Sequence, residues 1–391
     1  MTELEYLAIA YALFIFLIGL EAGVSLWKKN GRYQLDEMFG NIGHGIVYQT
    51  FDYATKASVM VPFILVSTHF AIVELPMDAW WGWLLAIVIF DFINYWLHRH
   101  SHEVNAMWAV HAVHHAAEDY NLAAALRQPL LSQLYTWIYR LPMALFMPVE
   151  MFIGVVVIDY IYQFVQHTQY VPRLGPVGWL MNTPSHHRVH HGRNEKYLDR
   201  NYGAIFIIWD RLFGTFQKEE EPVDFGITRP LHTVDPIWGN LVFWKRLVAA
   251  SRQATTLRSS ISVWLKGPGD IDIPTDNEGQ KQATKPTATL TVYVIANAAM
   301  SMPALPALIY FGEQWGLPAQ LALSAFILTS TSLLIALIEG RPWARKLEPV
   351  RAVVFAVGML WLVPASLDAI SNMPAIEPVA AEHTSDQINP S

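Results

Sequence analysis

Long apolar stretches constrain this chain more than any other feature of its sequence. A helix needs about 20 consecutive, mostly apolar residues to cross the hydrocarbon core of a membrane. Stretches that meet or approach this length recur along the 391 residues, at 4–27, 46–70, 79–97, 130–146, 151–165, 290–311, 318–339 and 349–370. We therefore predict an all-α fold, a polytopic membrane helical bundle of eight spans.

The spacing of these stretches divides the chain into five parts. Residues 1–78 would form the first membrane helices, and residues 79–240 a histidine-rich catalytic domain. The segment 241–288 begins with cationic residues interleaved with Val, Leu and Trp, which favours an interfacial helix on anionic lipid, with a solvated basic helix as the alternative. Its second half is rich in Pro, Gly and Asp and predicts a linker. Residues 289–371 supply the last membrane helices, and residues 372–391 a polar tail.

Cationic residues indicate the orientation, because Lys and Arg collect in cytoplasmic loops. They occur after the first and third spans, through residues 168–288, and between the last two spans. The turns at 74–78, 148–150 and 312–316 contain neither residue. We expect a histidine-rich cap with an active site facing the cytoplasm, and both termini on the opposite side of the membrane.

Composition removes several classes of cofactor and partner. The chain has no cysteine, which excludes disulfides, iron–sulfur clusters and thiolate-bound metals, and leaves histidines and carboxylates as metal ligands. Its net charge is −7 and it has no basic block, so nucleic acid is not an expected partner. The apolar stretches make the membrane an expected partner.

Ten of the 15 histidines fall into three tight groups, at 98–102, 111–115 and 186–191. Residues three or four apart share one face of a helix, so most members of a group point in one direction. His100 lies off the shared face, and His186 is doubtful because it precedes a complete set. The remaining eight exceed the four ligands that one zinc ion usually takes and suit two metals. They are His98, His102, His111, His114, His115, His187, His190 and His191.

A carboxylate inside the third predicted span extends the histidine pattern. Asp91 is spaced so that it shares a helix face with His98 and His102. An ionisable residue inside a membrane helix is costly and marks function by default. We expect Asp91 to accept a hydrogen bond from a ligand imidazole, which is the usual arrangement around metal-bound histidines.

The fifth predicted span repeats this arrangement. Asp159, Gln163 and His167 follow each other at intervals of four residues, and His167 emerges at the end of the span where the cap begins. His167 is therefore a candidate ninth ligand. Glu103, next to His102, is a candidate ligand, base or substrate-positioning group, and its spacing does not decide among these roles. Ordinary packing or surface roles are expected for His44, His69, His232 and His383.

Two metals held by neutral nitrogen donors can keep coordination positions open for O₂. Ligand type alone leaves iron, zinc, copper and nickel open, but oxidation of an unactivated C–H bond requires a cofactor of this kind. Metals at the base of membrane helices would let a lipid tail approach sideways. A metal transporter should instead carry polar ligands near the bilayer midplane. A zinc-dependent hydrolase would need only about three protein ligands.

The boxes HxxxH, HxxHH and HHxxHH, in this order, resemble the fatty acid hydroxylase/sterol desaturase superfamily of membrane di-iron enzymes. Flanking segments, including 102–109, 118–128 and 187–216, further resemble the alkylglycerol monooxygenase family within it. The resemblance is dense over residues 85–240. It implies that the eight box histidines bind two Fe ions, and that Glu103 matches a glutamate that the family requires.

The resemblance also implies a reaction. The family uses O₂ and tetrahydrobiopterin to hydroxylate the ether-linked carbon of alkylglycerol lipids, which then release a fatty aldehyde. The alternative is hydroxylation or desaturation of a sterol, fatty-acyl or carotenoid substrate with a separate protein electron donor. Asp91, Asp159 and Glu103 would support catalysis, and the polar residues expected beside the substrate are Asn121, Arg127 and Gln128. Zinc can replace iron in a purified sample, because imidazole accepts both metals.

Overall fold

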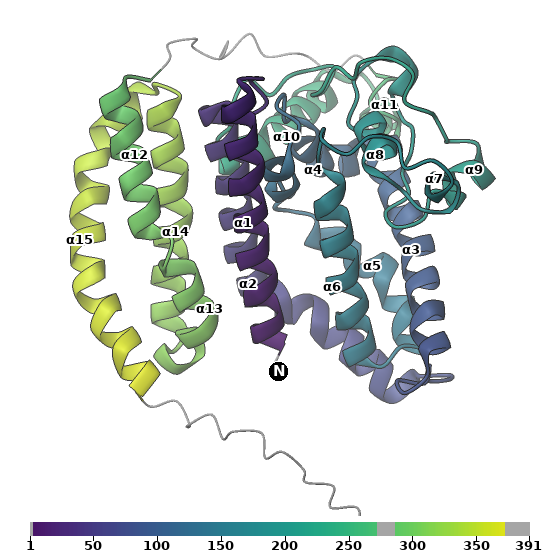
Figure 1. Ribbon diagram of the computed structural model, residues 1–391, viewed down its shortest axis with the longest axis horizontal. Coiled ribbons are helices and arrows are strands. Elements are labelled where there is room, and N and C mark those ends of the chain that lie inside the picture. Colours follow the sequence, from purple (N-terminus) through teal and green to yellow (C-terminus); the bar gives the residue numbers. More distant parts are fainter. Residues whose placement is uncertain (1–2, 272–285, 372–391) are drawn as a thin grey trace, which may run out of the picture.

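The computed structural model describes residues 3–271 and 286–371. Helices form the fold, and the described residues contain no β-strand beyond two isolated bridges. Long helices run roughly parallel, and short helices gather at one end of the bundle (Figure 1). The predicted polar tail with His383, and most of the predicted linker, lie outside the described residues. The all-α prediction is confirmed.

The long helices follow the apolar stretches of the sequence. They are α1 (Glu3–Lys28), α2 (Leu35–Phe70), α3 (Trp80–Glu103), α6 (Val149–Gln166), α12 (Ala288–Ser301), α13 (Ala304–Trp315), α14 (Leu317–Ile338) and α15 (Pro342–Ser371). Within the described residues, five helical segments are long and apolar enough to cross a membrane: α3, α6, α12 with α13, α14, and α15. The chain is therefore an integral membrane protein.

The predicted span at 130–146 is not a single membrane helix. The structure places α5 (Gln133–Arg140) and the 3₁₀ helix η2 (Leu141–Leu145) there, with eight and five residues. Pro142 lacks a backbone N–H and cannot continue an α-helix past its first turn, which explains the break. The segment still returns the chain to the far end of the bundle, where the Leu145 carbonyl accepts a hydrogen bond from the Ile72 amide.

Short helices build the cap at the opposite end of the bundle. They are α4 (Asn105–His115), η1 (Leu122–Leu126), α7 (Val177–Leu180), α8 (Pro184–His190), η3 (Glu195–Tyr197), α9 (Ile208–Phe213), α10 (Pro236–Gln253) and α11 (Leu257–Leu265). An apolar core joins α4 to α10 and α11, with Ala112 and Val113 packed among Val242, Phe243 and Leu247. This core fixes the helix that carries the second histidine group.

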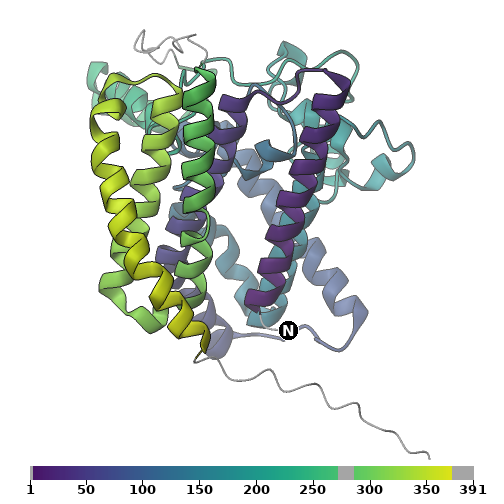
Figure 2. The same ribbon diagram turned by 60° about the vertical axis from the view of Figure 1, so that its left-hand side comes forward.

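The last helices pack against α2 through α14. Gly43 of α2 lies directly against the Ile335 side chain, so a larger residue would separate the two helices. Figure 2 shows α12 to α15 as a layer on one side of the molecule, away from the cap helices α7 and α9. The C-terminal layer therefore supports α2 and supplies no histidine to the cap.

Candidate metal centre

Four elements bring nine histidines together at the cap end of the bundle. The last turns of α3 supply two, α4 supplies three, α8 and its C-cap residue supply three, and the residue after α6 supplies one. The nine separate into two groups, in each of which the candidate ligand atoms lie within 4.8 Å of one another. The five-histidine cluster holds His98, His102, His111, His115 and His190, and the four-histidine cluster holds His114, His167, His187 and His191.

Helical spacing explains which histidine joins which cluster. Residues four apart on one helix go to the same cluster, as His111 and His115 do on α4. The histidine between them, His114, faces the other cluster. The third group repeats this division, since His187 and His191 share the four-histidine cluster and His190 joins the other. Helices α4 and α8 therefore each contribute to both clusters and hold them side by side.

Backbone carbonyls orient the imidazole rings. The Nδ1 atom lies 2.8–3.0 Å from a carbonyl oxygen in four cases: His98 with Tyr202, His190 with Arg200, His114 with Arg127, and His167 with Gln163. A carbonyl can only accept, so Nδ1 carries the proton in each ring. The Nε2 lone pair is then free and points into the cluster, which is the arrangement found for metal-bound histidines.

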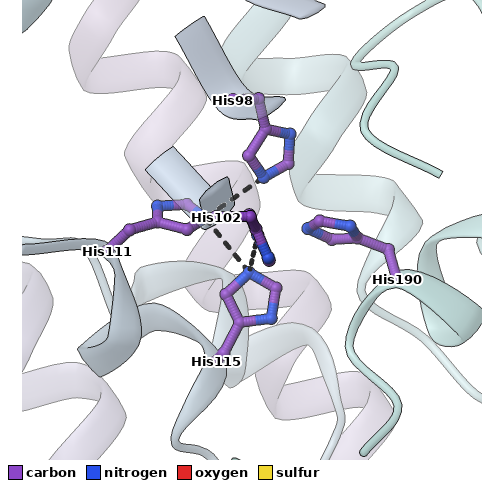
Figure 3. Close-up of side chains that lie close together, drawn as sticks. All are labelled: His98, His102, His111, His115 and His190. Atoms are coloured by element: carbon purple, nitrogen blue, oxygen red, sulfur yellow. Dashed lines mark hydrogen bonds between the residues drawn. The ribbon is translucent and has the colours of Figure 1, made fainter. Parts of the chain in front are cut away.

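Distances between these nitrogens fit bound metal ions. The Nε2 atom of His111 lies 3.1 Å from that of His98 and 3.1 Å from that of His115 (Figure 3). Two nitrogens bound to one metal at about 2.1 Å, at right angles, are about 3.0 Å apart. Among the described residues, the buried Nε2 atoms of His190 and His191 have no hydrogen-bond partner. The donor sets therefore fit two metal ions.

Burial favours the neutral form of four imidazoles on α4 and α8. It lowers the pKa of His190 and His191 well below the usual value for histidine, and neighbouring imidazoles lower it further. The same causes lower the pKa of His114 and His115. A neutral imidazole is the form that binds a metal, so these rings can accept an ion without first losing a proton.

A cavity of 180 Å³ reaches the clusters from the cap side. Its lining includes the buried His102, His115, His190 and His191, together with the apolar walls of the half-buried Trp108 and the buried Phe243. Its exposed lining includes the polar residues Asp199 and Thr228. The five-histidine cluster supplies three of the four histidines in this lining, so it is the more accessible of the two.

Two residues beside the five-histidine cluster were missed by the sequence reasoning. The Tyr202 ring lies 5.2 Å from the His102 ring, and its buried hydroxyl has no partner among the described residues. An Asp199 carboxylate oxygen lies 3.5 Å from Nδ1 of His102. Asp199 has a φ of 57°, which is rare for a residue other than glycine. Their positions depend on a loop that returns from the third histidine group, which no short-range pattern reveals.

The expected hydrogen bond from an imidazole to Asp91 is wrong. The Asp91 carboxylate instead accepts hydrogen bonds from the backbone amides of Ile205 and Phe206, at 2.7 and 3.0 Å, and from the Trp209 indole at 2.8 Å. Tyr202 lies three residues before Ile205 in the same loop, and its carbonyl orients the His98 ring. Asp91 therefore acts on the cluster through the loop and not through a ring.

Among the described residues, Asp159 also has no hydrogen bond to an imidazole. One carboxylate oxygen accepts hydrogen bonds from the Asn94 and Gln163 side chains, at 3.3 and 2.8 Å. The Gln163 carbonyl in turn accepts the proton of His167 Nδ1 at 2.8 Å. The predicted alignment of Asp159, Gln163 and His167 is present, and its effect on the ring is indirect.

The residues expected beside the substrate lie in internal contacts. The Arg127 guanidinium is buried and donates to the Val113 carbonyl and to the side chains of Glu37 and Asn41. The Asn121 side chain caps η1, and that of Gln128 donates to the Ala125 carbonyl. The structure therefore favours a supporting role for these residues, because their polar groups are used within the fold.

Three other candidates lie outside both clusters. Glu103 pairs with Arg99 at 2.9 Å on the half-exposed end of α3, so it is not a metal ligand in this geometry. His100 contacts the Tyr139 hydroxyl, and His186 contacts the Thr183 hydroxyl. His100 and His186, which the sequence pattern sets apart from the other box histidines, thus lie outside both clusters.

Comparison with known proteins gives matches over most of the chain. The family model for fatty acid hydroxylase matches residues 83–215. An alkylglycerol monooxygenase of Danio rerio is 34% identical over 364 residues, covering 90% of this chain and 81% of the relative. Those of Xenopus tropicalis and Homo sapiens are 37% and 39% identical over 68% of this chain. The match spans 59% and 60% of those two relatives. No solved structure matches the chain.

The fold and the site together define an integral membrane protein with two adjacent histidine clusters that fit non-haem iron. The matched residues 83–215 include all nine clustered histidines. The chain belongs to the fatty acid hydroxylase family, and alkylglycerol monooxygenases are among its relatives.

Proposed function

We propose that this protein is an O₂-dependent lipid monooxygenase with two non-haem irons. The observation that carries the proposal is the convergence of nine imidazoles, seven buried and two half-buried, in two adjacent clusters beside a cavity that reaches the more accessible one. Irons bound there would supply O₂ activation and hydrogen abstraction from an unactivated C–H bond. The nine clustered histidines would be the ligands, with Tyr202 and Asp199 among their polar neighbours.

An alkylglycerol is the substrate that we propose. Several relatives are named alkylglycerol monooxygenase, and the best-covered one aligns with 90% of this chain. The cavity also has a fitting chemistry, since Trp108 and Phe243 are apolar while the exposed Asp199 and Thr228 can hydrogen-bond to hydroxyl groups. In an ether lipid, an apolar alkyl chain and a polar glycerol with hydroxyl groups meet close to the carbon that would be oxidised.

The reaction balances with one external two-electron donor. One oxygen atom of O₂ enters the C–H bond next to the ether oxygen, and the other leaves as water. Two electrons and two protons come from the donor, which we propose to be tetrahydrobiopterin. The resulting hemiacetal splits into glycerol and a fatty aldehyde. The residues of the chain would exclude bulk water and hold the oxidised carbon beside the five-histidine cluster.

The membrane arrangement supports a cap that faces the cytoplasm. All nine clustered histidines lie at one end of the bundle, at the end where the sequence concentrates Lys and Arg. Helix α11 exposes Leu257, Ile261 and Leu265 on one face, next to Arg258 and Lys266. This amphipathic face fits the predicted interfacial helix and would rest on anionic lipid beside the cap.

An aerobic assay tests the function directly. Membranes that contain the iron-supplemented protein receive an alkylglycerol with and without tetrahydrobiopterin, and fatty aldehyde is measured. We expect aldehyde that depends on both O₂ and the pterin and that is absent with His190→Ala. Iron-loaded protein that forms no aldehyde would overturn the ether-lipid proposal. The same membranes would then be offered sterol, fatty-acyl and carotenoid substrates with a protein electron donor.

A further inference from the structure

Two short helices of the cap carry an exposed apolar surface that the catalytic proposal does not use. We name the region of α7, α9 and the residues just before α7 the α7–α9 lobe. Its large apolar side chains point outward, with Trp179 70% and Leu212 68% exposed. The other members of this surface are Leu174, Val177 and Leu180. An apolar surface of this kind on an ordered lobe indicates a partner.

The lobe is held firmly against α3. The Trp209 ring lies 5.0 Å from Phe92, and the Phe213 ring lies 5.0 Å from Trp96. The neighbouring residue Asp91 accepts a hydrogen bond from the Trp209 indole N–H at 2.8 Å. In Figure 1, α7 and α9 lie beside α3 and project outward from the bundle. The depth of the lobe in a membrane therefore follows from the position of these α3 residues.

Helix geometry gives that depth. Helix α3 begins with the exposed pair Trp80 and Trp81, and tryptophan is enriched at membrane–water interfaces. Phe92 and Trp96 lie 12 and 16 residues further along, about 18 and 24 Å above Trp80 at about 1.5 Å per residue. The hydrocarbon core is about 30 Å thick. The contacts between lobe and α3 thus fall within the half of the membrane that is next to the cap.

Arg211 joins the two helices of the lobe in a manner suited to an interface. Its guanidinium donates to the Gly178 and Trp179 carbonyls, at 3.0 and 3.2 Å, and lies 4.6 Å from the Trp179 ring centroid. Arginine beside an exposed tryptophan combines a polar group with an apolar ring, as required where headgroups meet acyl chains. The lobe therefore has both the depth and the chemistry of a membrane-interface element.

We propose that the α7–α9 lobe inserts its exposed apolar side chains into the bilayer leaflet on the cap side. Lipid is the partner that fits, because the lobe packs on the membrane helix α3, whose exposed apolar side chains include Leu84 and Leu85. An isolated hydrophobic patch far from the membrane would instead fit a protein. The proposal concerns membrane contact alone and stands independently of the substrate.

Membrane contact at the lobe would also steady the five-histidine cluster. The Asp210 carboxylate on α9 accepts the backbone protons of Tyr202 and Gly203, at 2.7 and 2.8 Å. The Tyr202 carbonyl in turn orients His98. A lobe seated in the leaflet therefore fixes the peptide that holds a candidate ligand.

Spin labels test the contact in the whole protein, because the chain contains no cysteine that would compete for the label. Leu212→Cys is labelled in phosphatidylcholine nanodiscs, and collisions with O₂ and with a water-soluble nickel chelate are compared. Leu84→Cys on α3 provides the lipid control, and Glu195→Cys on the cap provides the aqueous control. Leu180→Cys gives a second label on the lobe if the first variant does not fold.

The expected result is a ratio of O₂ to nickel collisions that is several-fold above that of Glu195→Cys and close to that of Leu84→Cys. A ratio matching Glu195→Cys would place the lobe in water and overturn the proposal. Protection from both reagents would also overturn it, because a second copy of the chain or another protein would then cover the surface.

Discussion

The two histidine clusters lie side by side but differ in access. All members of the four-histidine cluster are buried, and of these four residues His191 alone lines the cavity. The five-histidine cluster has His98 and His111 half-buried, and three of its members line the cavity. On the proposed function, substrate and O₂ would meet the five-histidine cluster, and a metal held by the four-histidine cluster would lie in more protected surroundings.

The clusters also differ in how their rings are held. In the four-histidine cluster the carbonyl of Gln163 lies on α6, and that of Arg127 belongs to the buried residue that caps η1. In the other, the carbonyls of Arg200 and Tyr202 belong to a loop that is fastened through Asp91. The accessible cluster therefore depends on a distant segment of chain, and the protected cluster depends on buried packing. Substitutions that remove one of these two supports and leave the other intact test whether the clusters differ in this way.

The largest effect is expected from removing one ligand of each cluster. His190→Ala in the five-histidine cluster and His167→Ala in the four-histidine cluster should both abolish aldehyde formation, because the reaction needs both metals. The assay is the pterin-dependent aldehyde measurement in membranes. His100→Ala, which leaves both clusters complete, is the control and should keep its activity. Full activity in His167→Ala would show that the protected cluster is not part of the site.

Next in size is the loss of the buried support behind the four-histidine cluster. Arg127→Met leaves Glu37 buried without its guanidinium at 3.2 Å, and breaking such a pair costs about 3–5 kcal/mol of folding free energy. The midpoint of thermal unfolding in detergent should fall markedly. Arg99→Met, which breaks a more exposed pair with Glu103, should cost about 0–1 kcal/mol. If Arg127→Met folds with an unchanged unfolding midpoint and only its KM is raised, Arg127 would contact the substrate and not support the fold.

A smaller effect should follow from loosening the loop that supports the five-histidine cluster. Asp91→Asn replaces an acceptor of three hydrogen bonds by a group that itself carries protons, so the loop and the His98 ring lose alignment. Changes around metal ligands often cost about 10–100-fold in activity. Trp209→Phe removes one of the three bonds and should lose less. Equal and full activity in both variants would reduce Asp91 to a packing role.

The smallest effect is expected at the exposed rim of the cavity. Asp199→Asn keeps the shape of the side chain but removes the charge 3.5 Å from His102 Nδ1. Because Asp199 is 65% exposed, we expect a loss of about tenfold or less, at the low end for residues around metal ligands. Turnover at saturating substrate is the measurement, and Glu195→Gln on the cap surface is the neutral control. A loss as large as that of Asp91→Asn would contradict the order proposed here.

Much of this centre could be predicted from local spacing. Helical periodicity brings the eight box histidines to the cap, and the four-residue interval from Gln163 leads to His167. The expectation that the histidines of one box point in one direction is wrong for the second and third boxes. The division into two clusters could not be predicted, because adjacent residues such as His114 and His115 face different sites. That division depends on how α4 and α8 cross, which is a property of tertiary packing.

Long-range hydrogen bonds account for the wrong expectations. Asp91 was correctly singled out as a costly carboxylate in an apolar helix, but its partners lie 114–118 residues away in a returning loop. Arg127 looked like a substrate contact because no local pattern reveals Glu37, which lies 90 residues earlier. The length of α5 was also misjudged, since apolar composition at 130–146 hides the helix break at Pro142.

The most direct test of the central claim is a count of bound metal in the purified, iron-supplemented protein, with iron and zinc summed. The two clusters predict two metal ions per folded chain. Because metal affinity depends on the ligand set, His190→Ala and His167→Ala should each retain about one. One ion per wild-type chain, or two in either folded variant, would contradict a centre built from two separate histidine clusters.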